Sequence, residues 1–339
     1  MYERYYGLRE RPFELTPNPR YLLLTEKHKE ALSILKYGIS ERKGVTMVLG
    51  SAGTGKTTLI RAALNSFADA QPRFACLNNP TLTRDELVET LARAFELGDE
   101  AAHSKAALLE KLQALLEERR AAGVVTALIV DEAQSLSDEL LEEIRLLVNI
   151  ESETDKLLPV VLVGQAELAD RLNEPSYAAV KQRIALRCDL LPLTAAETAQ
   201  YIATRIRTAG GVPSQLFTRE AVDLIHERSQ GIPRTISVIC DNALVTGFAV
   251  DQRPIGRQLV LEVCRDFDLQ APSEAGDAHA AEPTDPPRAA EAARPAKAKE
   301  PPLEEAALTA RAASATMKPR GEPGLFGGFS RSQRSWFSR

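Results

Sequence analysis

The stretch Gly50-Ser51-Ala52-Gly53-Thr54-Gly55-Lys56-Thr57 decides the fold of this chain. It matches the pattern G-x-x-x-x-G-K-[ST] without a gap. Residues 45–49 before it are apolar or β-branched and predict a buried strand, and residues 56–68 have apolar side chains at helical spacing. A strand, a glycine-rich loop and a helix in this order make backbone N–H groups converge on a phosphate. A glycine turn that binds nothing would have no use for Lys56 and Thr57 at the helix start.

The same loop supplies side chains for a nucleotide and its cation. Lys56 is expected to reach the β- and γ-phosphates, and the Thr57 hydroxyl is expected to hold Mg²⁺. We assign the next residue, Thr58, to the nucleotide-binding set together with the whole loop. The sequence therefore predicts ATP and Mg²⁺ as ligands.

Two acidic residues form a second motif. Residues 124–130 are apolar apart from Thr126, which predicts a strand buried on both faces, and Asp131-Glu132 follow directly. Asp131 is expected to bind the Mg²⁺ shell, and Glu132 is expected to orient or polarise the attacking water. Adjacent carboxylates at a strand end could also form a solvated turn, but the phosphate loop favours the catalytic interpretation.

Four further polar residues are candidates for the site, and they lie near the ends of later predicted strands or helices. Gln165 comes after the predicted strand at 160–163 and is expected to touch the γ-phosphate or the water; the alternative is a helix start signal. Arg187 is expected just before the last strand, and it and Arg183 are either surface charges or fingers that act on a neighbouring subunit's nucleotide. Arg234 follows a Gly-Ile-Pro break at a helix start and suits a residue aimed at a phosphate.

Composition limits the remaining possibilities. The chain has 339 residues, which permits two domains, and 44% of them are hydrophobic, which supports a sizeable core. The net charge of −5 argues against a nucleic-acid-binding surface that extends over the whole chain, but it does not exclude a local basic face. The four cysteines are far apart without a C-x-x-C pair, so we expect buried free thiols rather than disulfides or a zinc site.

Composition also divides the chain into four segments. Residues 1–25 form an aromatic strap in which prolines exclude a helix, and it either packs beside the nucleotide base or is a plain strap. Residues 26–192 are the α/β core and 193–268 a small helical lid. Residues 269–339, rich in alanine, proline and charged residues, form a disordered tail.

The two ends of the chain indicate location. Residues 325–339 combine aromatics with arginines, which suits docking to an acidic partner or a membrane surface; the alternative is a solvated end without a role. The N-terminus does not resemble a signal peptide, and no stretch of about twenty apolar residues occurs. We expect a cytoplasmic protein that can sit peripherally at the inner membrane.

The motifs resemble a known family in their order and combination. The phosphate loop, Asp131-Glu132, Gln165, Arg187 and Arg234 occur as in an AAA+ ATPase. Over about residues 1–268 the chain is similar to the general secretion pathway protein A family, closest to the branch found with exosortase and exopolysaccharide gene clusters. This finer resemblance rests on Tyr6-Gly7-Leu8, Pro12-Phe13, Pro19-Arg20-Tyr21, Asp131-Glu132-Ala133-Gln134, Glu143-Ile144-Arg145-Leu146-Leu147 and Val163-Gly164-Gln165.

The resemblance implies a three-layer αβα P-loop core with a small all-α lid. By motif, Lys56 and Thr57 look like Walker A residues, and Asp131 and Glu132 like Walker B. Gln165 occupies the sensor 1 place, where Asn or Thr is commoner. Arg187 resembles the finger of a Ser-Arg-Cys motif with Leu in place of Ser, Arg183 is its rival, and Arg234 looks like sensor 2.

The resemblance also implies a function. It is Mg²⁺-dependent ATP hydrolysis by a homo-oligomer, a ring or a dimer, coupled to assembly or regulation of an envelope secretion or exopolysaccharide export system. The secretion proteins continue into a membrane span and a peptidoglycan-binding region, whereas this chain ends in a soluble tail. Two alternatives remain: a DNA-associated regulator of the transposition type, and a nucleotide-gated scaffold with little turnover, against which Glu132 counts.

Overall fold

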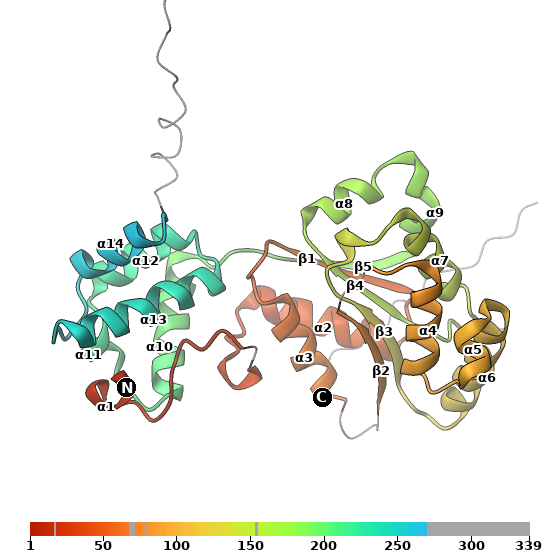
Figure 1. Ribbon diagram of the computed structural model, residues 1–339, viewed down its shortest axis with the longest axis horizontal. Coiled ribbons are helices and arrows are strands. Elements are labelled where there is room, and N and C mark those ends of the chain that lie inside the picture. Colours follow the sequence, from red (N-terminus) through yellow and green to blue (C-terminus); the bar gives the residue numbers. More distant parts are fainter. Residues whose placement is uncertain (17, 68–71, 79–80, 153–154, 270–339) are drawn as a thin grey trace, which may run out of the picture. The chain divides into compact units, whose positions relative to one another are not determined.

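The computed structural model describes residues 1–16, 18–67, 72–78, 81–152 and 155–269. A parallel five-stranded sheet lies among the helices α2 to α9, within residues 26–181 (Figure 1). The strand order is β2-β3-β4-β1-β5, and every neighbouring pair is parallel. The strands are β1 (Val45–Gly50), β2 (Arg73–Leu77), β3 (Thr126–Val130), β4 (Val160–Gly164) and β5 (Ile184–Leu190).

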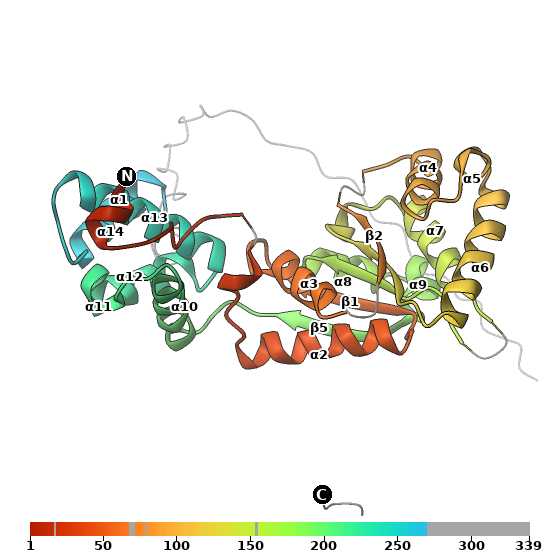
Figure 2. The ribbon, with the colours of Figure 1, turned by 90° about the horizontal axis from the view of Figure 1, so that it is seen from below.

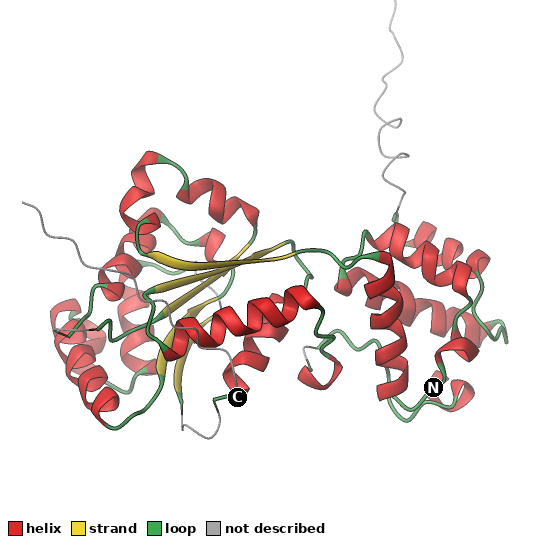
Figure 3. Cartoon of the chain, turned by 180° about the vertical axis from the view of Figure 1, so that it is seen from behind, coloured by secondary structure: helices red, strands yellow, loops and turns green. Residues whose placement is uncertain are grey.

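The inner strands are apolar because helices cover both faces of the sheet. All residues of β3 and β4 are buried. Along β1, Val45, Met47 and Leu49 contact one apolar cluster and Val48 contacts another, as the two-residue repeat of a strand requires. The yellow strands of Figure 3 lie between red helices. This arrangement confirms the predicted three-layer α/β ATPase fold.

One face of the sheet is covered by two helices, α2 (Glu26–Ser40) and α3 (Lys56–Asn65). The helix after the phosphate loop therefore ends earlier than the predicted residue 68. The other face carries six helices within the described residues: α4 (Arg84–Ala94), α5 (Asp99–His103), α6 (Lys105–Ala121), α7 (Asp138–Val148), α8 (Ala166–Leu172) and α9 (Ala178–Lys181). Short 3-10 turns lie between some of these elements: η1 (Pro19–Tyr21), η3 (Ala133–Ser135) and η4 (Pro175–Tyr177).

The edge strand β5 corrects the predicted place of Arg187. Arg187 is the fourth residue of β5, not a residue before it, and Arg183 directly precedes the strand. From Ile184 onward, the side chains of β5 alternate as in a strand: every second one is partly or fully buried, and those between are exposed. Arg187 and Asp189 occupy exposed positions. The other edge strand, β2, exposes Cys76, so only three of the four free cysteines are buried as expected.

The remaining helices pack around a separate apolar cluster. They are α10 (Ala195–Thr208), α11 (Pro213–Leu216), α12 (Arg219–Ser229), α13 (Pro233–Ala249) and α14 (Arg257–Asp266). Tyr2, Tyr6, Leu8 and Phe13 of the N-terminal segment are buried in the same cluster. The predicted boundaries 26–192 and 193–268 remain predictions, and the predicted disordered tail, with its aromatic and arginine-rich end, lies outside the described residues from residue 270 onward.

The N-terminal segment contains a helix that the sequence analysis excluded. Residues Tyr2–Tyr6 form α1, which packs on α13 (Figure 2). The prolines of this segment lie further along, so they do not prevent a helix at residues 2–6. Gly7, with φ 70°, ends α1 in the left-handed conformation that glycine adopts easily. Among the described residues, no helix has both the length and the apolar character needed to cross a membrane.

A buried carboxylate joins three helices on one side of the sheet. Glu143 of α7 is 5% exposed and accepts a hydrogen bond from Lys105 Nζ at 2.8 Å. It also pairs with Arg84 at the start of α4, and Lys105 is the first residue of α6. The neighbouring Glu142 forms an ion pair with Arg145 while its side chain is 52% exposed.

Replacing Glu143 with alanine should lower the free energy of unfolding by about 1–3 kcal/mol, because two cations lose a buried partner but can still reach water. Glu142→Ala is the matched control and should change it by less than about 1 kcal/mol, as an exposed pair does. Urea unfolding of both variants measures the difference. Equal losses would show that the buried pairs do not fasten α4 and α6 to α7.

Candidate functional site

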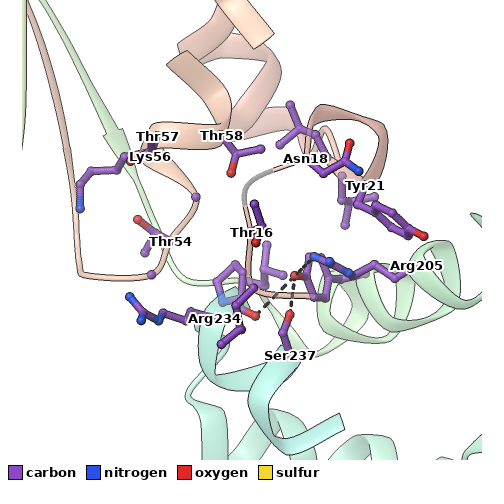
Figure 4. A pocket seen from close by; sticks show the side chains of 18 of the residues that line it. Thr16, Asn18, Tyr21, Thr54, Lys56, Thr57, Thr58, Arg205, Arg234 and Ser237 are labelled. Atoms are coloured by element: carbon purple, nitrogen blue, oxygen red, sulfur yellow. Dashed lines mark hydrogen bonds between the residues drawn. The ribbon is translucent and has the colours of Figure 1, made fainter. Parts of the chain in front are cut away.

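A pocket of about 350 Å³ lies against the phosphate loop (Figure 4). Three segments that are far apart in the sequence line it. Residues 52–58 of the loop and of the start of α3 contribute one wall, and residues 14–23 of the N-terminal strap contribute another, without residues 17, 19 and 20. The third wall contains Leu193 and five further residues at or near α10 and α13: Tyr201, Arg205, Pro233, Arg234 and Ser237. His28 and Glu132 also line the pocket. The structure therefore brings the strap to the phosphate loop, as one of the two sequence interpretations requires.

The backbone of the loop needs its glycines. Gly53 and Gly55 have φ values of 81° and 99°, which side chains rarely tolerate. A Cβ atom on Gly53 would also lie 2.7 Å from the Cβ atom of Arg234. Gly55 is the N-cap of α3, and within the described residues no side chain caps that helix. The first N–H groups of α3 can therefore donate to an anion.

Lys56 lies inside the loop and is 6% exposed. Its Nζ donates to the carbonyl oxygens of Gly50, at 2.8 Å, and Ser51, at 3.1 Å. Burial lowers the pKa of Lys56, and nearby carboxylates, Glu132 first, oppose that shift. An ammonium group is thus removed from water at the point where a phosphate would sit.

The two predicted cation ligands are in contact. Thr57 Oγ1 donates to Asp131 Oδ2 at 2.9 Å, so the start of α3 meets the end of β3. A hydroxyl and a carboxylate are the hard oxygen ligands that Mg²⁺ takes, with phosphate oxygens and water filling its other positions. The described residues hold no cluster of three or more His, Cys, Asp or Glu that would form a metal cage by itself. The donor set fits Mg²⁺ bound together with a nucleotide.

Glu132 follows Asp131 in a left-handed conformation, with φ 52°, and lines the pocket. Its Oε2 accepts a hydrogen bond from Gln134 Nε2 at 2.7 Å. Gln134 Oε1 in turn accepts from the backbone N–H of Gln165 at 3.2 Å. Gln165 is the N-cap of α8, as the alternative interpretation holds, and it does not line the pocket. The sequence analysis gave Gln134 no role at the site.

The structure separates the three candidate arginines. Arg234 lines the pocket, and its backbone N–H donates to Gly53 O at 3.2 Å. Arg187 does not line the pocket, and its Nη2 donates to Asp189 Oδ1 at 3.0 Å. Arg183 lies at the opposite end of β1 from the loop, because its carbonyl accepts from Val45 N–H at 3.1 Å. Of these three arginines, therefore, only Arg234 lines the pocket within one chain.

A buried arginine that the sequence analysis missed fastens the strap. Arg205 of α10 is 8% exposed and donates to the carbonyl oxygens of Pro12 and Glu14 at 2.5 and 3.0 Å. It also donates to Tyr201 OH at 2.6 Å and lies 4.8 Å from the ring centroid of Tyr21. A single sequence carries no signal for this contact, because its partners are carbonyl groups about 190 residues away.

A buried histidine lies between the strap and the loop. His28 is 4% exposed, and its Nδ1 lies 2.7 Å from Thr25 Oγ1. A Cβ atom on Gly55 would be 3.9 Å from His28 Nε2. Burial lowers the pKa of His28, which favours a neutral ring beneath the phosphate loop.

Comparisons with known proteins agree with this geometry. Residues 39–172 match the family described as AAA domain. The chain is 39% identical over 249 residues to general secretion pathway protein A of Aeromonas hydrophila, a match that covers 74% of this chain and 45% of that protein. The chain thus spans less than half the length of this curated relative.

Two solved structures share the fold at low identity. The ORC2 protein of Aeropyrum pernix, in ADPNP–ADP complexes, has a TM-score of 0.59 and 19% identity, covering 80% of this chain and 76% of that one. Drosophila ORC bound to DNA has a TM-score of 0.58 and 21% identity, covering 78% and 66%. The chain is thus similar to the AAA domain family over residues 39–172 and to a general secretion pathway protein A over 249 residues, while the solved structures share its fold.

Proposed function

We propose that this chain binds ATP with Mg²⁺ and hydrolyses it to ADP and phosphate. The observation that carries the proposal is the contact between Thr57 Oγ1 and Asp131 Oδ2, 2.9 Å apart beside the buried Lys56. It joins a loop that suits phosphates to an acidic strand end that suits a divalent cation. Glu132 follows directly and lines the same pocket.

Each residue has a role in the proposed reaction. The N–H groups at the start of α3 and the Lys56 ammonium bind the phosphates, while Thr57 and Asp131 hold Mg²⁺. Bound Mg²⁺ would neutralise charge on the β- and γ-phosphates. Glu132 orients or polarises the attacking water. Gln165 follows β4 outside the pocket lining, and its proposed role is to reach the γ-phosphate or the water from there. The aromatic and apolar strap residues around Tyr21 suit the nucleotide base.

We further propose that hydrolysis drives assembly or regulation of an envelope secretion or exopolysaccharide export system. The identity to general secretion pathway protein A supports the secretion role, and the finer resemblance supports exopolysaccharide export. The working form would be a homo-oligomer at the cytoplasmic face of the inner membrane. The likeness to ORC bound to DNA concerns the fold alone and does not favour DNA as partner. Capture of partners by Glu132→Gln, which should hold ATP, tests this role; nucleic acid as the sole captured species would overturn it.

Lys56→Ala should weaken ATP binding about tenfold or more, because a charge-assisted contact to phosphate is lost. Titration with a fluorescent ATP analogue measures the affinity. Lys111→Ala, which removes an exposed lysine of α6, is the control and should bind normally. Unchanged affinity in Lys56→Ala would refute the phosphate-loop assignment.

Glu132→Gln should bind ATP normally and lower the rate of phosphate release by about two or more orders of magnitude, the usual scale for a group that acts on the attacking water. Glu139→Gln, at an exposed position of α7, should keep full turnover. If affinity and turnover fall together in Glu132→Gln, Glu132 is structural rather than catalytic.

Arg187→Ala should bind ATP normally and turn over slowly at any protein concentration, because in the proposed oligomer Arg187 acts on the neighbour's γ-phosphate. Its exposed pair with Asp189 contributes at most about 1 kcal/mol and does not hold it in place. Fingers of this kind are worth roughly three to five orders of magnitude in other phosphate-loop enzymes.

Mixing tests the trans arrangement directly. Arg187→Ala mixed with Lys56→Ala should regain activity, because each variant supplies what the other lacks. In the comparison, Arg183→Ala is mixed with Lys56→Ala. If only this second mixture regains activity, Arg183 is the finger. If neither mixture regains activity although the oligomers are intact, the site is complete within one chain.

A further inference from the structure

We propose that Gln134 is a positioning residue that holds the Glu132 carboxylate and ties its orientation to the end of β4. This inference rests on the proposed ATP hydrolysis. The Gln134 side chain makes two hydrogen bonds in opposite senses. Its Nε2 donates to Glu132 Oε2 at 2.7 Å, and its Oε1 accepts from the N–H of Gln165 at 3.2 Å.

An amide side chain suits both contacts, because its donor and its acceptor are separate atoms. It offers a donor and an acceptor on one planar group, whereas a carboxylate offers acceptors alone and an ammonium donors alone. The two partners also fix which way the amide faces, because the reversed group would set oxygen against carboxylate and NH₂ against N–H. The pair of contacts therefore uses both ends of the Gln134 amide, which neither a carboxylate nor an ammonium could do.

The backbone around Gln134 is built to hold the amide there. Gln134 lies in η3, directly after the left-handed Glu132 and the fully buried Ala133. A Cβ atom on Gly164 would lie 3.0 Å from Gln134 Oε1, closer than ordinary contacts allow. The glycine at the end of β4 therefore leaves the room that the amide oxygen uses.

A second set of contacts anchors the same turn to α8. The Arg171 guanidinium donates to the carbonyl oxygen of Gln134 at 3.4 Å and to that of Leu136. Arg171 Nε also donates to Tyr177 OH at 3.2 Å, and Tyr177 OH donates to Asp138 Oδ1 at 2.6 Å. Both the backbone and the side chain of Gln134 are thus attached to the β4–α8 segment.

These attachments have a consequence for the proposed reaction. A base that acts on water must be held close to its productive geometry, and Glu132 has a solvent-accessible side chain that could otherwise change rotamer. The neutral amide orients the carboxylate without placing an opposite charge beside it. The amide oxygen of Gln134 accepts a hydrogen bond from the Gln165 N–H, and the amide nitrogen donates to Glu132. A displacement of the β4–α8 turn would therefore also move the Glu132 carboxylate.

Two variants of Gln134 and one control test the role. Gln134→Leu removes both hydrogen bonds, and Gln134→Glu keeps the acceptor but replaces the donor with a carboxylate that repels Glu132. Gln113→Leu is the control, because Gln113 Nε2 likewise donates to a glutamate, Glu117, at 3.0 Å on the exposed face of α6. Steady-state ATP hydrolysis gives kcat and KM, nucleotide titration gives Kd, and thermal unfolding gives Tm.

Both Gln134 variants should lower kcat about 10- to 100-fold, the usual effect of removing a group that orients a functional side chain. Their KM and Kd for ATP should stay within about twofold of the parent chain, a split that a merely structural role would not produce. Gln113→Leu should match the parent in all respects. If Gln134→Leu does not fold, Gln134→Glu, which keeps the side-chain shape, decides the outcome.

A double variant separates this role from the proposed function. In Glu132→Gln/Gln134→Leu, kcat measured with radiolabelled ATP should equal that of Glu132→Gln within about twofold, because the positioned carboxylate is already gone. A multiplicative loss would overturn the positioning role. Turnover that depends on Glu132 but not on Gln134 would overturn this role alone. Turnover that does not depend on Glu132 would overturn the assigned base and this role with it.

Discussion

Parallel pairing of β1, β4 and β3 is the constraint on which the candidate site depends. Parallel strands end at the same edge of a sheet, so segments that follow them meet there. The phosphate loop follows β1, Asp131 follows β3, and Gln165 follows β4, which lies between them. The hydrogen bond from Thr57 to Asp131 therefore joins residues 74 positions apart without any special loop. A register slip in any of these strands would separate the two predicted cation ligands.

The sequence predicted this part of the structure because its signals are local. An apolar strand, a glycine pattern and adjacent acids each occur within about ten residues, and the parallel sheet assembles them. The sequence analysis was wrong about Tyr2–Tyr6 because prolines further along the strap were taken to affect the whole segment. It misplaced Arg187 because the alternation of an edge strand resembles an exposed turn when its neighbours are unknown.

Contacts between distant segments escaped the sequence analysis for a different reason. Arg205 binds backbone carbonyls, which every residue has, so its partners leave no mark on the sequence. Gln134 likewise bonds a backbone group, the N–H of Gln165, as well as the side chain of Glu132. The strap that Arg205 holds buries its aromatics in the same apolar cluster as α10 and α13. The start of the strap and the helix that carries Arg234 therefore share one apolar core, and residues of both segments line the pocket.

Several groups that are expected to face the nucleotide already have partners in the chain. Lys56 Nζ bonds two carbonyl oxygens of the loop, Thr57 bonds Asp131, and the Glu132 carboxylate bonds Gln134. At these side chains a bound triphosphate would therefore exchange hydrogen bonds, and such exchange yields little net free energy by itself. The gain would come from the uncapped N–H groups at the start of α3 and from charge, because the phosphates would replace neutral carbonyl partners around an ammonium that burial has removed from water. The same exchange would free Asp131 from the Thr57 hydroxyl, so that phosphate binding and cation binding would assist each other at this edge of the sheet.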